Sequence, residues 1–393
     1  MGLRRFLIGI SVVAALLALT ALSTGEPDNR MAVLIGFRNL PDAALVKAHG
    51  GSVSRVFDIV PAVAARVAEG VIAQLERDPK VAYVEEDRPL FAVYDPGTEI
   101  LPWGIARIGA PAVWLGGNTA AGVRVAVLDT GIDFNHPDLA ANYVGGYDFY
   151  RKDAVPNDEN GHGTHVAGII AAADDGPNFG GRNSGTSVIG VGPQVDLLAA
   201  KFLGPDGSGS TSDEISAIQW AVQNGARVIN MSYGSYWRSR TEENALKNAN
   251  SRGVYLAAAA GNDGGPWTIY PAGYKSVVSV AATDSSNIRA SFSNYNKDVE
   301  LAAPGVGILS TMPTYAAYLN TQYGLATTYE YLSGTSMACP HVSGAAALVI
   351  WKYPGWSASQ VQNRLNSTAT NLGAAGRDAY YGYGLVNAAA AAQ

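Results

Sequence analysis

The stretch Val125-Ala-Val-Leu-Asp-Thr-Gly131 is a continuous apolar run that ends in a carboxylate and a glycine. Its strand is expected over residues 123–128, and further strand-like runs follow at 195–203, 227–231, 254–260 and 276–281. Amphipathic helical stretches separate these runs at 164–173, 213–224 and 241–252, and two late helices are expected at 336–351 and 358–366. Continuous apolar strands that alternate with helices indicate a parallel sheet covered on both faces. We therefore expect an α/β fold with a doubly wound parallel sheet.

Two further segments place a reactive side chain beside glycine at the start of a helix. They are Gly161-His-Gly-Thr-His-Val-Ala-Gly168 and Gly334-Thr-Ser-Met-Ala-Cys-Pro-His-Val-Ser-Gly344. In a doubly wound sheet, groups at the carboxyl ends of the strands converge on one crevice. A serine hydroxyl becomes a good nucleophile only when a neighbouring, correctly oriented imidazole can take its proton. The aspartate, histidine and serine of these segments are therefore candidates for one catalytic site.

These segments, in the order aspartate, histidine, serine, resemble the subtilisin-like serine peptidases, the subtilases. The similarity runs from about Leu101 to Gln393 and includes Asn135-His-Pro-Asp-Leu139, Val228-Ile-Asn-Met-Ser232 and Tyr383-Gly-Leu-Val-Asn387. The resemblance implies a secreted serine endopeptidase that forms an acyl-enzyme. It implies Asp129, His162 and Ser336 as the catalytic triad, with Asn262 as a donor to the oxyanion.

The choice of histidine depends on the resemblance. His162 and His165 lie about one turn apart at the same helix start, so the residues alone do not choose between them. The family pattern assigns the base to His162 and leaves His165 a structural role. Asp129 has a plain alternative as a turn or cap residue, but the apolar strand before it predicts burial, and a buried carboxylate needs a partner. Asp133 and Asp138 are interpreted as turn and metal-site residues.

The resemblance also implies where a peptide substrate binds. An extended peptide would bind by strand addition between two segments, Ser208-Gly209-Ser210 and Ser232-Tyr233-Gly234, while Ala259, Ala260 and Gly261 would line the primary pocket. Ile269 precedes Tyr270-Pro271, where many subtilisins carry glycine. If Ile269 faces the pocket, the pocket is shallower and a preference for large aromatic side chains is in doubt.

A smaller unit precedes the catalytic segments. Strands are expected at 32–37, 53–57, 62–67 and 81–84 and helices at 41–49 and 71–77, an order typical of a small α+β ferredoxin-like unit. Lys47-Ala-His-Gly-Gly51, Pro61-Ala-Val-Ala-Ala65 and Pro79-Lys-Val-Ala-Tyr-Val-Glu-Glu-Asp87 are similar to the inhibitory propeptide of the subtilase family. The resemblance implies that the chain inhibits itself and cuts itself near Phe91–Gly97, and within that range we expect the cut after Tyr94.

The first residues are typical of a secretory signal. Positive residues precede an apolar run at 6–22, and small residues favour a cut after Ser23, with an uncleaved membrane anchor as the alternative. We therefore expect a signal peptide at 1–23, an inhibitory propeptide at 24–94 and a secreted, monomeric peptidase domain at 95–393. A net charge of −6 without a basic run argues against nucleic acid as a partner.

The resemblance implies one strong structural calcium site and no organic cofactor. Its ligands would be oxygens of Glu99, Asp138, Asn183, Ser184, Thr186 and Val188. A second site at Asp148, Arg151, Asp153 and Asn157 is not expected, because Arg151 and Lys152 put positive charge where a ligand should lie. Cys339 is the only cysteine, so it forms no intramolecular disulfide, and we interpret it as a small buried apolar residue.

Other classes of protein fit less well. A metal-dependent hydrolase could use Asp129, His162 and His165, but the chain lacks His-Glu-x-x-His, and Ser336 and Asn262 would then have no role. An esterase is less favoured, since Gly334-Thr-Ser-Met-Ala338 is not Gly-x-Ser-x-Gly. A catalytically inactive binding protein of the same fold is the remaining alternative, and the complete set of reactive residues argues against it.

Overall fold

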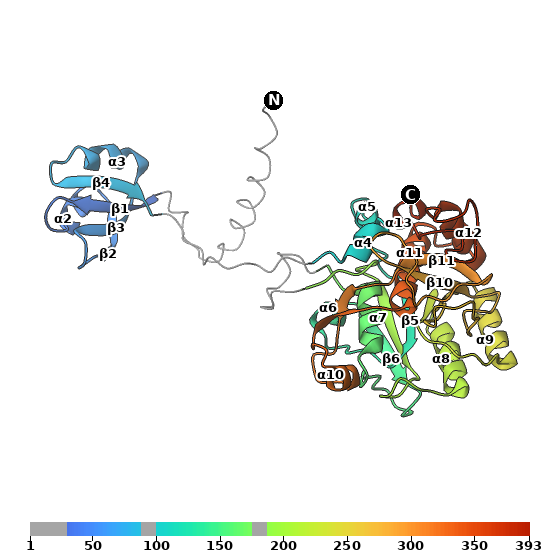
Figure 1. Ribbon diagram of the computed structural model, residues 1–393. Helices are drawn as coiled ribbons and strands as arrows, with labels where there is room; N and C mark the ends of the chain where they lie inside the picture. The colour runs from blue at the N-terminus through green and yellow to red at the C-terminus, as the bar shows by residue number, and fades with distance from the viewer. Residues whose placement is uncertain (1–29, 88–99, 175–186) are drawn as a thin grey trace. The chain divides into compact units, whose positions relative to one another are not determined.

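The computed structural model describes residues 30–87, 100–174 and 187–393. The chain divides into two compact units, Met1–Tyr94 and Asp95–Gln393, and each is described here by itself (Figure 1). The predicted signal segment, 1–23, lies outside the described residues. Within the described ranges, no helix is both long enough and apolar enough to cross a bilayer.

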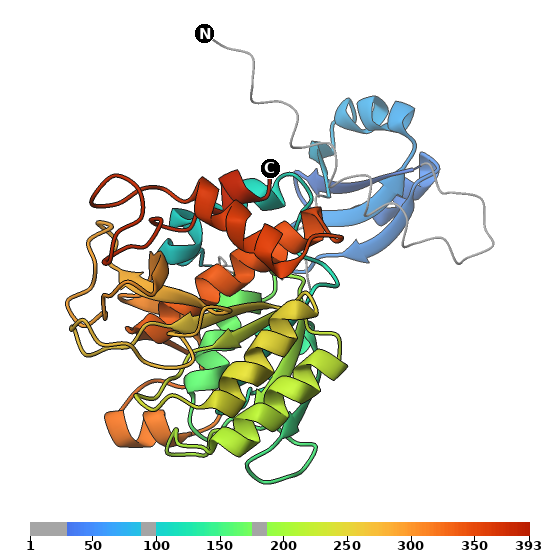
Figure 2. The same cartoon turned by 90° about the vertical axis from the view of Figure 1, so that its right-hand side faces the viewer.

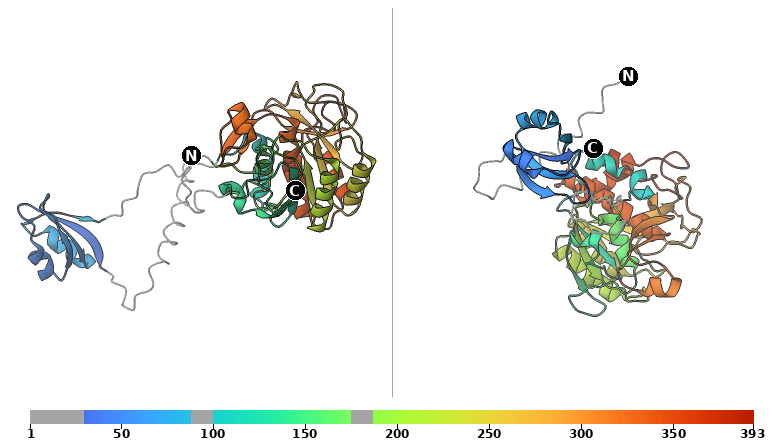
Figure 3. Two further views of the ribbon diagram at one scale, coloured as in Figure 1. Left: turned by 90° about the horizontal axis from the view of Figure 1, so that it is seen from below. Right: turned by 90° about the vertical axis from the view of Figure 1, so that its left-hand side faces the viewer.

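The first unit has the predicted order of elements. They are β1 Met31–Phe37, α2 Ala43–Ala48, β2 Ser52–Val56, β3 Ala62–Val67, α3 Glu69–Glu76 and β4 Val81–Glu86, and the antiparallel sheet has the order β2-β3-β1-β4 (Figure 3). Val33, Ile35 and Phe37 alternate along β1 toward one buried face, as strand geometry requires. Val46 of α2 and Leu75 of α3 join the same core, so both helices cover that face of the sheet.

The second unit is built on a parallel sheet. Its strands are β5 Arg124–Asp129, β6 Tyr143–Asp148, β7 Asp196–Lys201, β8 Val228–Met231, β9 Tyr255–Ala259, β10 Val278–Thr283 and β11 Val299–Pro304, in the order β11-β10-β9-β8-β5-β7-β6. All of the pairings are parallel. The strands that follow β5 first, β6 and β7, lie on one side of it, and the later strands, β8 to β11, lie on the other. The crevice of a doubly wound sheet therefore lies at the carboxyl end of β5.

Helices cover both faces of this sheet. Val125 and Val127 of β5 pack in one core with α7 His162–Ala171, α11 Thr335–Lys352 and α12 Ala358–Thr368. Ala126 and Leu128 face the other way, toward α8 Thr211–Gln223 and α9 Arg240–Ser251, which lie side by side (Figure 2). The long helix α11 contacts α7 and five strands, β5, β8, β9, β10 and β11. The predicted doubly wound α/β fold is confirmed.

Several elements were not predicted. They are the edge strands β6 and β11, the hairpin β12 Ile308–Thr311 with β13 Tyr329–Leu332, and the short helices α4 Trp103–Arg107, α5 Ala110–Trp114, α6 Pro137–Ala140, α10 Tyr318–Tyr323 and α13 Ala388–Ala391. Gly145 and Gly146 interrupt β6, and Pro304 ends β11, so neither strand has the pattern of a buried run. Glycine and proline are tolerated in such strands because an edge pairs on one side only.

Candidate active site

Three reactive side chains lie where strands and helices of the second unit begin or end. Asp129 is the last residue of β5, His162 is the first residue of α7, and Ser336 is the second residue of α11. The close approach of α7 to the end of β5 requires glycine, because a Cβ placed on Gly163 would overlap the carbonyl oxygen of Gly131. The glycines quoted from the sequence thus allow the histidine to reach the aspartate.

The Asp129 carboxylate and the His162 imidazole form a direct pair. His162 Nδ1 lies 2.8 Å from Asp129 Oδ1, and the backbone N–H of Thr130 donates to the same oxygen at 2.7 Å. Asp129 is fully buried, while the side chain of His162 is 24% exposed. Burial disfavours the imidazolium, but the charge and hydrogen bond of Asp129 favour it more, so the net effect raises the pKa of His162. The buried carboxylate therefore orients the ring and stabilises its protonated form.

A second buried aspartate, Asp158, holds the start of α7. Its Oδ2 accepts from the backbone N–H of Thr164 at 2.8 Å, and its Oδ1 accepts from Gly161 N at 2.8 Å and from Thr130 Oγ1 at 2.8 Å. A carboxylate at this position accepts hydrogen bonds from the free N–H groups of the first turn. Its negative charge also interacts favourably with the positive end of the helix dipole. Asp158 therefore fixes the turn that carries His162. Sequence reasoning missed this residue.

The other histidines of this unit have different surroundings. His165 is fully buried, its Nε2 donates to the carbonyl of Glu330 at 3.1 Å, and burial lowers its pKa to about 3. His341 is buried inside α11, and burial lowers its pKa to about 4. His136 caps α6, accepting from Asp138 N at 3.1 Å. Of the four histidines, His162 alone is held by an aspartate carboxylate, which favours it over His165 as the base.

Ser336 is held at the start of α11 by a reciprocal pair of contacts with Ser232. Ser336 Oγ donates to the carbonyl of Ser232 at 2.9 Å, and Ser232 Oγ donates to the carbonyl of Ser336 at 2.8 Å. In this conformation the hydroxyl is directed to that carbonyl rather than to the imidazole. Hydrogen bonds between catalytic groups often tighten only when a substrate is bound.

Cys339, one turn later, is fully buried, and burial raises the pKa of its thiol to about 12.

Asn262 is oriented by Thr335. The Asn262 Oδ1 accepts from the backbone N–H and from the hydroxyl of Thr335, both at 2.9 Å, and the same hydroxyl accepts from Gly261 N at 3.1 Å. With its oxygen held in this way, the amide turns its Nδ2 toward Gly334 at the start of α11. Both N–H groups needed for an oxyanion site are thus available beside Ser336. Sequence reasoning placed no role on Thr335.

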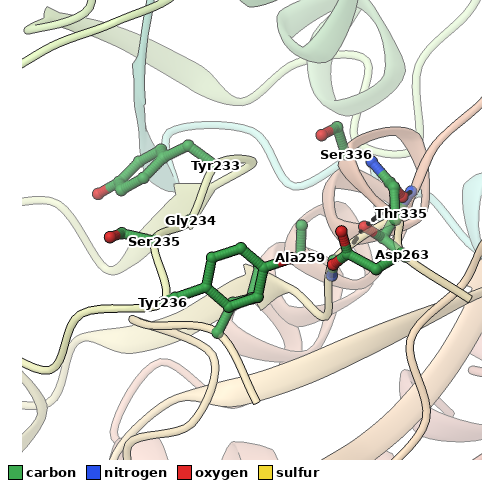
Figure 4. Close-up of a pocket in the computed structure, with 11 residues that line it drawn as sticks. Tyr233, Gly234, Ser235, Tyr236, Ala259, Asp263, Thr335 and Ser336 are labelled. Atoms are coloured by element: carbon green, nitrogen blue, oxygen red, sulfur yellow. Dashed lines mark hydrogen bonds between the residues drawn. The ribbon is translucent and has the colours of Figure 1, made fainter. Parts of the chain in front are cut away.

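A pocket of about 250 Å³ opens beside Ser336 (Figure 4). Six of the residues expected at the site line it: Tyr233, Gly234, Ala259, Gly261, Asn262 and Ser336. Ile269 also lines it, together with Ser235, Tyr236, Asp263 and Thr335, which were not predicted. Asp263 follows Asn262 directly in the sequence and could have been found from that position. Ser235 follows the expected Gly234 in the same way, whereas Tyr236 lies one residue further along.

The expected segment Ser208-Gly209-Ser210 is not part of this pocket. All three residues are exposed, and Ser210 is the N-cap of α8, where its hydroxyl accepts from Asp213 N at 3.1 Å. Gly209 pairs with Leu203 in an isolated bridge. The structure therefore gives this segment a capping and turn role, while its role in binding an extended peptide stays a prediction.

Ile269 fills the space between two glycines of the pocket wall. A Cβ placed on Gly234 would overlap the Ile269 side chain, and one placed on Gly261 would lie 3.1 Å from Ile269 Cδ1. Ile269 itself is 8% exposed. Asp263 lies on another side of the pocket, and hydrogen bonds from Tyr236 and Asn294 lower its pKa. The pocket thus has a limited apolar depth and an ionised carboxylate.

Only two of the expected calcium ligands, Asp138 and Val188, are among the described residues. Glu99, Asn183, Ser184 and Thr186 lie outside them, and the described ranges contain no cluster of three or more metal-binding side chains. The Asp138 carboxylate is buried and accepts from Val188 N and from the hydroxyl of Tyr329, each at 3.0 Å. Ile100 bridges to Val188 and donates to Ser187 O at 2.7 Å.

At the doubted second site, the side chain of Arg151 forms an ion pair with Glu159, and its backbone N–H donates to Asp148 Oδ1 at 2.8 Å. Asp148 and Asp153 form an isolated bridge through their backbones. The guanidinium is thus paired with Glu159, and the absence of a second calcium site stays a prediction.

Comparison with known proteins points to one family. A family model described as the subtilase family matches residues 120–384. Subtilisin NAT from Bacillus subtilis subsp. natto is 41% identical over 95% of this chain and 94% of its own length, and an alkaline protease from Alkalihalobacillus alcalophilus is 44% identical over 85% and 80%. The crystal structure of the psychrophilic subtilisin-like protease Apa1 from Pseudoalteromonas sp. AS-11 superposes with a TM-score of 0.65, at 29% identity, over 75% of this chain and 98% of that one.

The Asp129–His162 contact predicts the titration of the imidazole. In Asp129→Asn the favourable charge is lost while burial stays, so we expect the pKa of His162 to fall below its ordinary 6.5, whereas in the wild type it lies above 6.5. An NMR titration of the histidine ring protons measures both values. Asp196→Asn removes a half-exposed carboxylate that pairs with Arg124 and should leave the titration unchanged. An unchanged His162 pKa in Asp129→Asn would show that burial and other charges set it.

Proposed function

Because this chain belongs to the subtilase family and is a serine endopeptidase, we propose that Asp129, His162 and Ser336 are its catalytic triad. The observation that carries the proposal is the 2.8 Å contact between His162 Nδ1 and the buried Asp129 carboxylate. That contact leaves the other ring nitrogen, Nε2, as the atom that can accept a proton from Ser336. Ser336 and Asn262 share the lining of one pocket, which supports their joint action on a bound peptide.

In the proposed reaction the Ser336 oxygen attacks the carbonyl carbon of a peptide bond while its proton passes to His162 Nε2. The negative charge that develops on the carbonyl oxygen accepts hydrogen bonds from Asn262 Nδ2 and from the backbone N–H of Ser336. His162 then gives its proton to the leaving amine, the C–N bond breaks, and the acyl group stays on Ser336. Water repeats the sequence to release the acid, and Asp129 stabilises the imidazolium in both halves.

We also propose that the chain is secreted as a self-inhibited precursor, with a signal peptide at 1–23, a propeptide at 24–94 and the peptidase domain from Asp95. The first unit folds around its own core, and the boundary between the units, Tyr94 to Asp95, supports a cut there. A product strand that ends at Tyr94 would occupy the cleft at high effective concentration. The propeptide would then inhibit the domain from which it was cut.

The nucleophile and the self-cleavage are tested together with secreted full-length protein. Wild type should start at Asp95 and carry a fluorophosphonate label on Ser336, whereas Ser336→Ala should stay unlabelled and begin near Thr24, because the cut needs that serine. Turnover should fall on the order of a million-fold, a magnitude that itself comes from a subtilisin. Mass spectrometry reads the N-terminus and the labelled residue, and Ser367→Ala, an exposed serine on α12, is the matched control.

The same assay distinguishes the roles of His162 and His165. His162→Ala should lose turnover by several orders of magnitude, while His165→Ala should keep the label on Ser336 and lose mainly thermal stability. The reverse pattern would assign the base to His165. If Ser336→Ala still matures when it is made alone in a peptidase-free system, another protease makes the cut and self-processing is wrong.

The pocket geometry predicts a preference in the residue before the cleaved bond. Because Ile269 fills the space between Gly234 and Gly261, we expect small and medium side chains there to be cleaved faster than large aromatic ones. Ile269→Ala should raise kcat/KM for phenylalanine at that position by about tenfold or more relative to alanine, the range that a few methylene groups give in an apolar pocket. Peptide amide substrates that differ only at that residue measure the ratio.

Ile288→Ala is the matched control for this change, because Ile288 is 61% exposed and lines no part of the pocket. It should leave the ratio of the two substrates unchanged. A wild-type preference for phenylalanine that Ile269→Ala does not increase would show that the pocket widens when a substrate binds.

We further propose a structural calcium ion bound by Asp138 and oxygens of the neighbouring segments. Three stretches distant in sequence meet here: Asp138, Ser187–Val188, which follows the predicted ligand loop, and Ile100, which follows Glu99. A buried carboxylate beside backbone carbonyls is a suitable set for this hard ion. The bound ion would tie the start of the domain to its body.

Calcium should raise the melting temperature of the fluorophosphonate-inactivated enzyme, since it binds the folded chain and not the unfolded one. The gain is about 2.7 kcal/mol when calcium exceeds its Kd a hundredfold. Asp138→Asn should remove most of the shift measured by calorimetry, whereas Asp153→Asn at the doubted second site should keep it. A shift that survives in Asp138→Asn would place the ion elsewhere.

A further inference from the structure

Two buried carboxyl groups lie between α8 and α9 and have no part in the triad mechanism. They belong to Glu214 in the first turn of α8 and Glu242 in the first turn of α9, and each residue is only 4% exposed. Burying an ionised carboxylate is costly unless a cation or several hydrogen bonds compensate. The pair therefore calls for a physical explanation.

The two carboxyl groups are hydrogen-bonded to each other and to two tyrosines. Glu214 and Glu242 share a side-chain hydrogen bond, which requires one of them to carry a proton. Tyr233 Oη donates to Glu214 Oε1 at 2.8 Å. Tyr274 Oη has one proton and two acceptors, Glu242 Oε2 at 2.8 Å and the carbonyl of Ser239 at 2.9 Å. The arrangement is a chain of tyrosine, carboxyl, carboxyl and tyrosine that holds one proton at its centre.

Acidic groups dominate the electrostatics of this pair. Burial, followed by the charge of Glu242, raises the pKa of Glu214 to about 8, and burial also raises the pKa of Glu242. The groups that act on the tyrosines, Glu243 and Asp129, are also acidic. Arg238, which precedes α9, forms its ion pair with the partly exposed Glu243. Acidic pH thus favours the shared proton, and alkaline pH removes it to the solvent.

One end of this chain is the wall of the substrate pocket. Tyr233 lines the pocket, and its ring extends away from Ser336 toward α8 (Figure 4). The ring packs edge-to-face on Phe202, with centroids 4.7 Å apart. The residue before it, Ser232, holds Ser336 through two hydrogen bonds. The hydroxyl of Tyr233 is thus the anchor of a segment that contacts both the pocket and the nucleophile.

We propose that Glu214 and Glu242 are positioning residues that share a proton and hold Tyr233, and that loss of this proton in alkaline solution weakens substrate binding. The inference rests on the proposed peptidase function. With both carboxyls ionised, their repulsion separates the first turns of α8 and α9, and the Tyr233 anchor shifts with them. Asp129 and His162 lie outside this chain of hydrogen bonds, and Ser336 keeps its own two bonds with Ser232, so the chemical step is unchanged.

Steady-state kinetics from about pH 6 to about pH 10 test the proposal, with an extended peptide as substrate. In wild type KM should rise on the order of threefold to tenfold above about pH 8 while kcat stays level, the pattern of lost uniform binding. In Glu214→Gln the carboxamide accepts from Tyr233, donates to Glu242 and cannot titrate, so KM should stay flat. Tyr233→Phe removes only the anchoring hydroxyl and should raise KM at every pH.

Glu243→Gln is the matched control, because Glu243 is a partly exposed glutamate next to Glu242 on α9, and it should keep the wild-type profile. A Glu214→Gln profile that rises as in wild type would overturn the proposal. A profile that is flat in wild type would do so as well. Absence of peptidase activity in wild type would instead overturn the proposed function.

Thermal unfolding in a Ser336→Ala background tests the shared proton without activity. Because the folded pKa of Glu214 lies above its unfolded value of 4.5, wild type should lose stability as the pH rises from about 4.5 through about 8. Glu214→Gln should lack that loss, so its melting temperature should gain on wild type over the same interval. If the difference in melting temperature between Glu214→Gln and wild type were the same at every pH, the pair would hold no proton.

Discussion

The active site depends on one buried negative charge. Asp129 is fully enclosed at the end of β5, where an ionised carboxylate is stable only if hydrogen bonds replace the water it has lost. Thr130 N and His162 Nδ1 supply those bonds at Oδ1, and the imidazole is present only because α7 begins beside the end of the strand. Asp158 holds that helix start through its backbone N–H groups. The position of the imidazole therefore follows from the hydrogen bonds that the buried Asp129 carboxylate needs in place of water.

The buried framework could be predicted from the sequence, because apolar runs report burial on both faces of a sheet. Strands β5, β7, β8, β9 and β10 and helices α7, α8, α9, α11 and α12 were all expected near their observed positions. The edge strands β6 and β11 were not expected, because Gly145, Gly146 and Pro304 interrupt the apolar pattern by which a buried strand is recognised. Asp129, His162, Ser336 and Asn262 were expected from motifs. Thr335 and Asp158 were not, because their importance lies in which backbone groups they bind after folding, and spacing along the chain does not report that.

Acidic residues of the second unit differ in protonation because their neighbours differ. Asp263, beside the pocket, accepts hydrogen bonds from Tyr236 and Asn294, which lower its pKa. Glu214 lies behind the same pocket against another carboxyl group, and burial raises its pKa. One pocket thus has a charged acid at its surface and an acid that holds a proton behind its wall. In the proposed mechanism the cleft responds to pH in two ways, through the imidazole of His162 and, in the alkaline range, through its wall.

The burial of α11 has a consequence for how long such an enzyme survives among its own copies. The helix is buried without interruption from Met337 to Ile350, and it contacts α7 and five strands. Cleavage by another molecule requires a segment that opens locally into an extended form, and a helix with these contacts opens only when the whole domain unfolds. Exposed turns will therefore be cut first. A molecule nicked in such a turn keeps Ser336 in place, so loss of activity should lag behind the first cuts in the chain.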